Sequence, residues 1–287
     1  MPFTKELNKD FKIVDNHFEL SPDYLQKNQW RFKKITGTKF FNILNDKADG
    51  FSSPFKIWCQ MVGIYTEAMD PMLSKVGQIV EPKVREYVES KFNIKYKCYD
   101  PASVKWDVFH ENKIFGGIPD GEPEDNEGNL DYSNNKPMLE VKTSSIDRFD
   151  YKKVKGCFEL QKDANGLPIV KVPGAKRLTW FNPDGSFKIS KEYQFQLGLY
   201  LYLRNINNGM FAVVFLKPQD YLHPELVDVK DREVVTVAFN PTQDIKKTLQ
   251  PFIDKAETWY KKYILTGVSP EMLDSDKVWI KEVELIK

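Results

Sequence analysis

The sequence predicts an α/β fold with a central mixed sheet flanked by helices. Two observations support this prediction. Apolar residues recur at helical spacing near both ends of the chain, and the middle is rich in β-branched and aromatic residues bounded by turn signals. Helix, several strands, and then helix, strand and helix in this order favour a mixed sheet covered by helices.

Length and composition fit one large domain over residues 1–287. Hydrophobic residues make up 41% and aromatic residues 14%, which is enough for a sizeable core and argues against wholesale disorder. The net charge is +1, from 42 Lys and Arg against 41 Asp and Glu. A near-zero total gives no global attraction to nucleic acid, but local carboxylates and cations can cancel in this sum.

The cysteines, Cys59, Cys98 and Cys157, are far apart and form no C-x-x-C pair. This pattern favours free thiols in a reducing compartment and excludes an iron–sulfur cluster of the usual kind. The charged N-terminal residues do not resemble a signal peptide, and no apolar run reaches the ~18–20 residues of a membrane span. We therefore expect a soluble, cytoplasmic protein.

The first part of the chain predicts an irregular lead-in and two short helices. Residues 1–28 are polar, with scattered apolar positions. Gly37 and Thr38 begin a helix over 37–46, whose aromatic and aliphatic residues form one face. The serine–proline pair at 53–54 begins the next helix, because proline is favoured at the first helical position.

The clearest helix covers residues 71–92, where Leu and Val recur at three- and four-residue steps. Pro82 interrupts this pattern, because it lacks a backbone N–H and disfavours the α conformation of the preceding residue, Glu81. We expect a kink or a new helix start near Glu81.

The middle of the chain predicts three strands. Residues 95–110, 113–121 and 136–145 have the composition of strands and are bounded by turn signals. Between the last two, residues 122–135 are acidic and rich in Asn and Gly, which indicates a hairpin loop.

The last part of the chain alternates irregular and periodic segments. Residues 151–190 carry many Gly and Pro turn signals and predict an insertion with short strands. Residues 191–204 and 242–265 predict amphipathic helices, and residues 210–218 and 233–239 predict strands.

Two acids and a lysine in the middle region form a candidate site. Glu140 and Lys142 lie two apart in one predicted strand, so they project from the same face while Val141 faces the core. Asp120 ends the preceding strand, and pairing of the two strands would place Asp120 beside Glu140. The alternative is a surface hairpin whose charges face water.

Two converging carboxylates repel each other and favour a hard divalent cation between them. Magnesium bound there would polarise a phosphate oxygen and activate water, and Lys142 would stabilise the charge that builds on the phosphate. An E-x-K pair alone is not informative, since Glu81-Pro82-Lys83 also matches it. The combination of Pro-Asp-Gly and E-x-K on neighbouring strands is what points to a nuclease.

The order of motifs resembles the YqaJ-type viral recombinases, which are relatives of lambda exonuclease in the PD-(D/E)xK superfamily. The similarity runs over residues 31–203, about two-thirds of the chain. The matching segments are ITGTKFFNIL at 35–44, SPFKIW at 53–58, KVGQIVEPKVREYVE at 75–89, GIPDG at 117–121, MLEVKTSS at 138–145 and YQFQLGLYLYL at 193–203. The resemblance implies a restriction-endonuclease-like PD-(D/E)xK core.

The same resemblance implies a role for each residue of the candidate site. Asp120, Glu140 and the backbone carbonyl of Val141 would bind the metal ion. Lys142 would be the catalytic lysine. Glu81 would be the helix acid that assists the metal site, usually through water.

Further residues match supporting positions of the family. Gln194, Gln196 and Tyr200 resemble the residues that support the site or contact the DNA backbone; without the family they would be ordinary residues of a half-buried helix. Thr38, near a helix start, matches a hydroxyl that binds phosphate. Arg31 matches an arginine that binds a 5′-phosphate.

The resemblance implies a Mg²⁺-dependent exonuclease, with Mn²⁺ as a substitute, that degrades one strand of linear duplex DNA from the 5′ end for phage-type recombination. It also implies a single-strand annealing protein as a partner, a homo-oligomer such as a trimer, and the cytoplasm of a bacterium or phage-infected host. Two alternatives stay open: a restriction-type endonuclease and an inactive DNA-binding module. The lysines Lys152, Lys153 and Lys155 fit either a DNA groove or a solvated surface.

Overall fold

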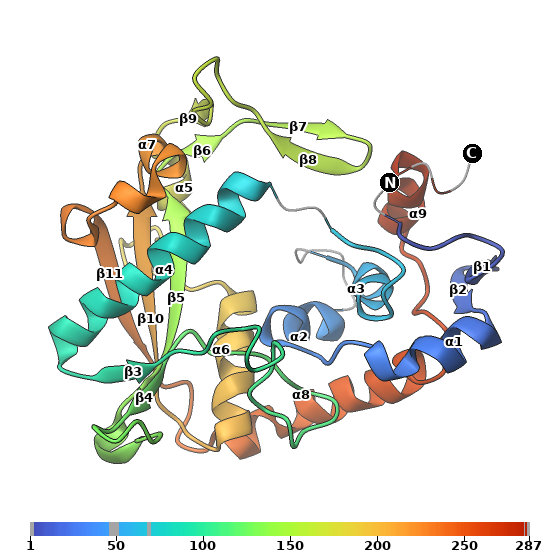
Figure 1. Ribbon diagram of the computed structural model, residues 1–287, viewed down its shortest axis with the longest axis horizontal. Coiled ribbons are helices and arrows are strands. Elements are labelled where there is room, and N and C mark those ends of the chain that lie inside the picture. Colours follow the sequence, from blue (N-terminus) through green and yellow to red (C-terminus); the bar gives the residue numbers. More distant parts are fainter. Residues whose placement is uncertain (1–2, 46–51, 68–69, 284, 286–287) are drawn as a thin grey trace.

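The computed structural model describes residues 3–45, 52–67, 70–283 and 285 (Figure 1). Its central sheet has the order β11–β10–β5, formed by β5 (Met138–Ser145), β10 (Gly209–Leu216) and β11 (Glu233–Phe239). Strand β10 is parallel to β5 and antiparallel to β11, which confirms the predicted mixed sheet. The parallel pair requires a long crossover, and helix α6 (Lys191–Arg204) lies in that connection.

Both faces of the sheet are covered, because every residue of β10 is buried. Met210, Ala212 and Val214 face helix α4 (Pro71–Phe92), which crosses the sheet in Figure 1. Phe211 packs on the other face, in the cluster that includes Leu197 of α6. The run of apolar residues in β10 is therefore that of a strand buried on both sides.

Helix α4 is continuous through Pro82, so the predicted new helix start near Glu81 is wrong. Asp70 caps its first turn by accepting a hydrogen bond of 2.8 Å from the Met72 N–H. Proline in a helix interior costs about 3 kcal/mol. Burial of four sheet-facing valines offsets this cost and holds the helix together; they are Val76, Val80, Val84 and Val88.

The other predicted helices are confirmed. They are α2 (Gly37–Leu44), α3 (Pro54–Met61), α6 and α8 (Ile245–Trp259), and a π-helical turn, Tyr260–Ile264, extends α8. The last residue predicted for the first of these helices, at position 46, lies outside the described residues. Helices α2 and α8 lie beside α6, and α3 lies beyond α2, away from β11 (Figure 1).

The predicted irregular lead-in over 1–28 is wrong for residues 11–28, which form regular elements. They contain the hairpin β1 (Phe11–Val14) and β2 (His17–Leu20), followed by helix α1 (Pro22–Asn28). The strands are too short for a clear pattern, but their aromatic side chains are fixed by distant parts of the chain. The shared aromatic contacts involve Phe3, Phe11, Phe18, Phe55, Tyr65 and Trp279.

The predicted strands over 95–110 and 113–121 are mostly wrong. The first reduces to β3 (Lys95–Lys97), which pairs with β4 (Glu122–Glu124) from the predicted loop. Residues 98–120 contain turns and one isolated bridge, between Ile35 and Phe115. A connection of this length without regular structure is uncommon and is usually functional.

The insertion over 151–190 contains short strands, as predicted. Its elements and their neighbours are β6 (Arg148–Phe149), β7 (Tyr151–Val154), β8 (Cys157–Leu160), β9 (Val170–Val172) and α5 (Ala175–Leu178). The β7–β8 hairpin reaches from the sheet towards α9 (Asp274–Glu282) in Figure 1, where Lys153 forms a 2.6 Å ion pair with Glu282. A short helix, α7 (Pro218–Leu222), follows β10.

The cysteines are free thiols, as predicted. Among the described residues, no helix combines the length and the apolar character needed to span a membrane.

Candidate active site

Strand β5 places Glu140 and Lys142 on one face, as their spacing predicts. The Lys142 ammonium contacts the Glu140 carboxylate directly. Val141 points to the opposite face and is 1% exposed, among the valines of α4. The pair is thus held on a rigid strand with a packed core behind it.

Asp120 lies beside this strand. Gly121 pairs with Leu139 in an antiparallel bridge, and the Asp120 carboxylate accepts a 2.7 Å hydrogen bond from the Val141 N–H. The predicted neighbourhood of Asp120 and Glu140 is therefore confirmed. A single bridge, rather than a hairpin of two regular strands, creates it.

The site holds more acid than its own cation neutralises. Burial and the Asp120 carboxylate raise the pKa of Glu140 to about 8. The same two causes raise the pKa of Glu81 to about 7. Burial opposes the charged form of Lys142, but Glu140 and Asp120 outweigh it and raise the pKa of Lys142 above its usual value. The carboxylates thus compete for protons or for an added cation.

Gln196 links the two residues of β5. Its side-chain amide donates to the Glu140 carboxylate at 2.5 Å, and its carbonyl oxygen lies 3.4 Å from the Lys142 ammonium. Gln194 points elsewhere and donates to the Ile189 carbonyl at 2.8 Å. Residues two apart on a helix face different directions, so only one of these glutamines meets the site.

Tyr200, one turn after Gln196, is 3% exposed and acts through the backbone around the site. Its hydroxyl accepts hydrogen bonds from the backbone of Gly37, the first residue of α2, and of Ile118. It thereby joins the start of α2 to the segment that ends at Asp120.

Gly117 permits the close approach of this tyrosine. Its φ of +137° favours glycine, and a Cβ there would lie 2.5 Å from the Tyr200 hydroxyl oxygen. We expect Gly117→Ala to lower the free energy of unfolding by about 2–4 kcal/mol, from backbone strain and overpacking together. Urea unfolding measures this change.

The matched control is Gly128→Ala, since Gly128 has a φ of +82° with nothing near its missing Cβ. Gly128→Ala should lower the free energy of unfolding by about 1–2 kcal/mol, from backbone strain alone. Equal losses in the two variants would show that contact with Tyr200 contributes nothing.

Thr38 and Arg31 differ in their relation to the site. Thr38 is exposed at the start of α2, with its hydroxyl 3.1 Å from that of Thr36. It lines a cavity of about 750 Å³ together with Gln196. Arg31 is exposed, does not line this cavity, and stacks on Trp30 with 4.5 Å between guanidinium and ring centre.

One carboxylate oxygen of Glu140 indicates whether a metal ion fits the site. Glu140 Oε2 is buried and has no hydrogen-bond partner among the described residues, while Oε1 accepts from Lys142 and Gln196. A buried acceptor without a partner is costly unless something else satisfies it. Because hard divalent cations prefer carboxylate oxygens, the residues present fit Mg²⁺ or Mn²⁺.

The backbone supplies a further candidate ligand. No cluster of three or more His, Cys, Asp or Glu side chains able to hold a metal occurs in the described ranges. Asp120 and Glu140 would thus need other ligands. In an extended strand the N–H and the carbonyl of one residue point to the same edge, so the Val141 carbonyl lies on the edge that faces Asp120.

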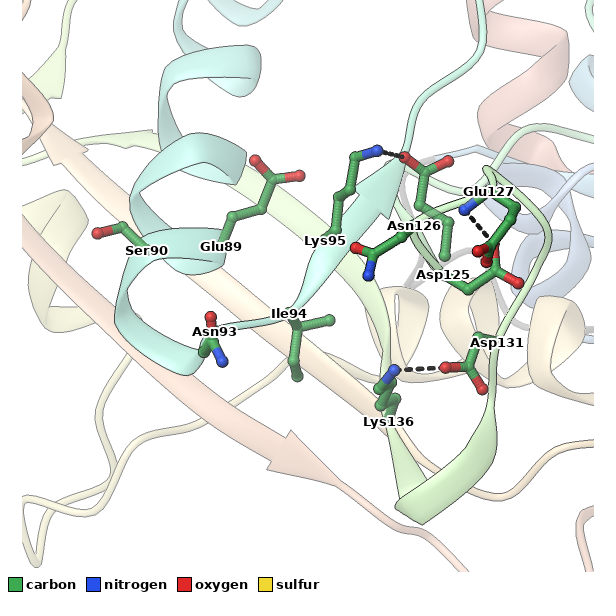
Figure 2. Close-up of a pocket in the computed structure, with 11 residues that line it drawn as sticks. Glu89, Ser90, Asn93, Ile94, Lys95, Asp125, Asn126, Glu127, Asp131 and Lys136 are labelled. Atoms are coloured by element: carbon green, nitrogen blue, oxygen red, sulfur yellow. Dashed lines mark hydrogen bonds and ion pairs between the residues drawn. The ribbon is translucent and has the colours of Figure 1, made fainter.

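The acidic segment 122–135 is not part of this site. It borders a separate cavity of about 470 Å³ (Figure 2). There Asp131 pairs with Lys136 at 2.5 Å, and Glu124 pairs with Lys95 at 3.1 Å. Asp125 accepts hydrogen bonds from the backbone of its own loop. These carboxylates are satisfied internally.

Two residues outside the predicted set also contact the site. Arg85 donates to the Asp120 carbonyl at 3.1 Å, and it lies four residues after Glu81 on α4, so helical spacing could have revealed it. Tyr193 lies beneath the Lys142 ammonium, 4.9 Å from nitrogen to ring centre. Its place before Gln194 on α6 carries no comparable signal.

Asp120 thus lies beside β5, the edge strand of the central sheet, which carries the E-x-K pair. No family model matches the chain. The chain is 46% identical over 282 residues to the uncharacterized protein MG373 of Mycoplasma genitalium, which covers 98% of this chain and 99% of the relative. An MG373 homolog from Mycoplasma pneumoniae matches with the same identity and coverage. The chain belongs to this MG373 family.

Solved structures with similarity to the chain include two exonucleases. An alkaline exonuclease, LHK-Exo, from Laribacter hongkongensis has a TM-score of 0.46 and 11% identity, over 84% of this chain and 92% of the other. A phage-related exonuclease from Haemophilus somnus has a TM-score of 0.47 and 10% identity, over 83% and 98%.

Proposed function

We propose that this chain is a divalent-metal-dependent deoxyribonuclease that degrades one strand of linear duplex DNA from the 5′ end. One observation carries the proposal: Asp120, Glu140 and Lys142 meet at one strand edge, with a buried Glu140 oxygen left without a partner. A structural ion pair needs one acid and one base. Two acids with raised pKa values beside one lysine fit a site that binds a cation and acts on a phosphate.

Asp120, Glu140 and the Val141 carbonyl would hold Mg²⁺, with Mn²⁺ as a substitute. When bound, the ion supplies Lewis-acid polarisation of the phosphodiester and lowers the pKa of water. Lys142 stabilises the negative charge that builds on the phosphate, as a compact and strongly charged donor.

Two residues prepare this arrangement. Gln196 keeps Glu140 and Lys142 in register through its two hydrogen bonds. Glu81 adds a carboxylate whose pKa, about 7, allows it to hold or release a proton near neutral pH. Apart from Asp120, which lies in the irregular segment 98–120, the site is thus built on β5, α4 and α6.

The finer parts of the proposal come from the motif resemblance. They are the 5′ to 3′ direction, a role in phage-type recombination, an annealing partner and a homo-oligomer such as a trimer. Thr38, exposed in the cavity beside Gln196, supports DNA contact there.

Digestion of three substrates tests the proposal: linear duplex with a 5′-phosphate, linear duplex with a 5′-hydroxyl, and closed circular DNA. With Mg²⁺ or Mn²⁺ we expect the phosphorylated duplex to be degraded first and the circle to remain intact. With EDTA we expect no digestion. Cutting of the circle would indicate an endonuclease instead, and activity that persists in EDTA would remove the proposed mechanism.

A further inference from the structure

The cavity beside the candidate active site is partly lined by residues that belong to none of the predicted motifs. Its volume is about 750 Å³, and it reaches the site through Gln196, whose amide donates to Glu140. Part of its wall is formed by Lys105 and Trp106, in the irregular segment 98–120. This wall has no part in the ligand set proposed above.

The cavity carries an excess of positive charge. Four lysines line it, and its one acid, Asp107, pairs with Lys34 at 2.5 Å. Across the described chain, Lys33, Lys39 and Lys105 have no carboxylate partner. Burial and the nearby Lys33 also lower the pKa of Lys39 to about 8. Lysines held close together without an acid favour an anionic ligand such as a phosphate.

Trp106 is exposed in a way that packing does not explain. It is 69% exposed, and within the described ranges its ring stacks on no other side chain and its indole N–H has no hydrogen bond. Trp30 is similarly exposed, at 75%, but it carries Arg31 on its face and donates to the Lys27 carbonyl. Trp106 thus presents an unoccupied aromatic face at the mouth of a basic cavity.

The backbone beneath Trp106 is strained. Lys105 and Trp106 both lie in the left-handed region, with φ of +52° and +60°, which side chains other than glycine adopt reluctantly. Backbone hydrogen bonds hold this turn, including one of 2.7 Å from the Trp106 N–H to the Pro101 carbonyl. Strain of this kind is concentrated at functional sites. Here it turns a large apolar ring towards solvent.

We propose that Trp106 is a stacking platform for an unpaired base of the DNA strand whose phosphates lie against Lys33, Lys39 and Lys105. The inference rests on the proposed nuclease function. Stacking on an aromatic ring is tolerant of sequence because every base has a flat face, and lysines beside it follow the backbone. Trp106 would therefore orient the strand end at the site without selecting its sequence.

Binding of labelled oligonucleotide duplexes tests this inference, measured by fluorescence anisotropy in EDTA. One duplex carries a short 5′-phosphorylated overhang with normal bases, and a second carries abasic sites in that overhang. We expect Trp106→Ala to raise the Kd for the first by about 5- to 100-fold, the range for loss of one stacked base. On the abasic duplex, wild type and Trp106→Ala should bind equally.

Two further variants complete the test. Trp106→Phe keeps an aromatic face and should bind the first duplex nearly as wild type does. Phe92→Ala removes an exposed ring outside the cavity and should bind unchanged. The inference is overturned if Trp106→Ala binds like wild type, or if it loses the same factor on both duplexes. A wild-type chain that binds with this pattern but digests no DNA contradicts the proposed function alone.

Discussion

Replacement of Lys142 by alanine is expected to slow DNA hydrolysis by about 10²- to 10³-fold, the cost of removing one preorganised group that stabilises transition-state charge. Lys142 is the cation that contacts Glu140, and its side chain is only 17% exposed. Its charge therefore acts in a partly desolvated site, where electrostatic interactions are stronger than in water. Single-turnover digestion of a linear duplex with Mg²⁺ measures the loss.

Ion binding separates the role of Lys142 from those of the acids. Calorimetric titration with Mn²⁺ should show binding retained or tightened in Lys142→Ala, because a cation that competes for Glu140 is gone. Asp120→Asn should bind Mn²⁺ more weakly, since it replaces a ligand carboxylate by an amide. A Lys142→Ala variant that keeps more than a tenth of the wild-type rate would contradict the role given to this lysine.

A distant lysine serves as the control. Lys12 lies on the N-terminal hairpin, is 59% exposed and pairs with Glu19 at 3.0 Å. Lys12→Ala should leave both the rate and the ion binding unchanged, because exposed ion pairs contribute little. Lys142→Arg keeps the positive charge but should not restore the wild-type rate of hydrolysis, since a planar guanidinium cannot take the place of a compact ammonium.

The sequence predicted those elements whose pattern is long and regular. Helix α4 has 22 residues and repeats its valines at every fourth position from Val76 to Val88, and β10 is apolar throughout, so each pattern identified its element. The neighbourhood of Asp120 and Glu140 was also accessible, because both residues belong to one local stretch of chain. The predicted strand before Asp120 did not form, and a single bridge between Gly121 and Leu139 brings the two residues together instead.

Other features depend on contacts that no local pattern encodes. The hairpin β1–β2 has four residues in each strand, too few for a reliable alternation. Its Phe18 packs against Phe55 and exchanges hydrogen bonds with Ser269, both distant in sequence. Residues 98–120 have the composition of strands but find no partner strand. The rotation of α6 about its axis, which brings Gln196 and not Gln194 to Glu140, is set by packing alone.

The clearest contact that no local pattern predicts involves Glu122, in the acidic segment 122–135. Glu122 lies in a run of charged residues that predicts a solvated loop, yet it is fully buried. Arg204, at the end of α6, reaches it with bonds of 2.6 and 2.8 Å from its Nε and Nη2. The two residues are 82 positions apart in sequence, so no motif connects them.

Loss of the Glu122 carboxylate is therefore expected to destabilise the fold strongly. Glu122 accepts hydrogen bonds from three side chains. In addition to Arg204, the hydroxyl of Tyr99 donates to its carboxylate at 2.7 Å, and the hydroxyl of Tyr132 also donates to it. The Arg204 guanidinium lies over the Phe109 ring, 4.6 Å from its centre. Glu122→Ala would leave a half-buried guanidinium and two phenols without their acceptor.

Removal of one partner of a buried ion pair costs about 3–5 kcal/mol, because the other charge stays buried and uncompensated. We expect this loss in the free energy of unfolding of Glu122→Ala, measured by urea denaturation. Glu122→Gln keeps an acceptor for the phenols and should lose less. Glu124→Ala, two residues away, removes a pair with the 59% exposed Lys95 and should cost less than about 1 kcal/mol.

The Glu122→Ala variant also tests whether the stability of this segment affects metal binding at the candidate site. Glu122 follows Asp120 by two residues, and the bridge between Gly121 and Leu139 lies between them. If the buried pair anchors this segment, Glu122→Ala should also weaken Mn²⁺ binding under conditions where the chain remains folded, whereas Glu124→Ala should not. Equal unfolding free energies for Glu122→Ala and Glu124→Ala would contradict the anchoring role, since they would mean that burial adds nothing to the charge pair.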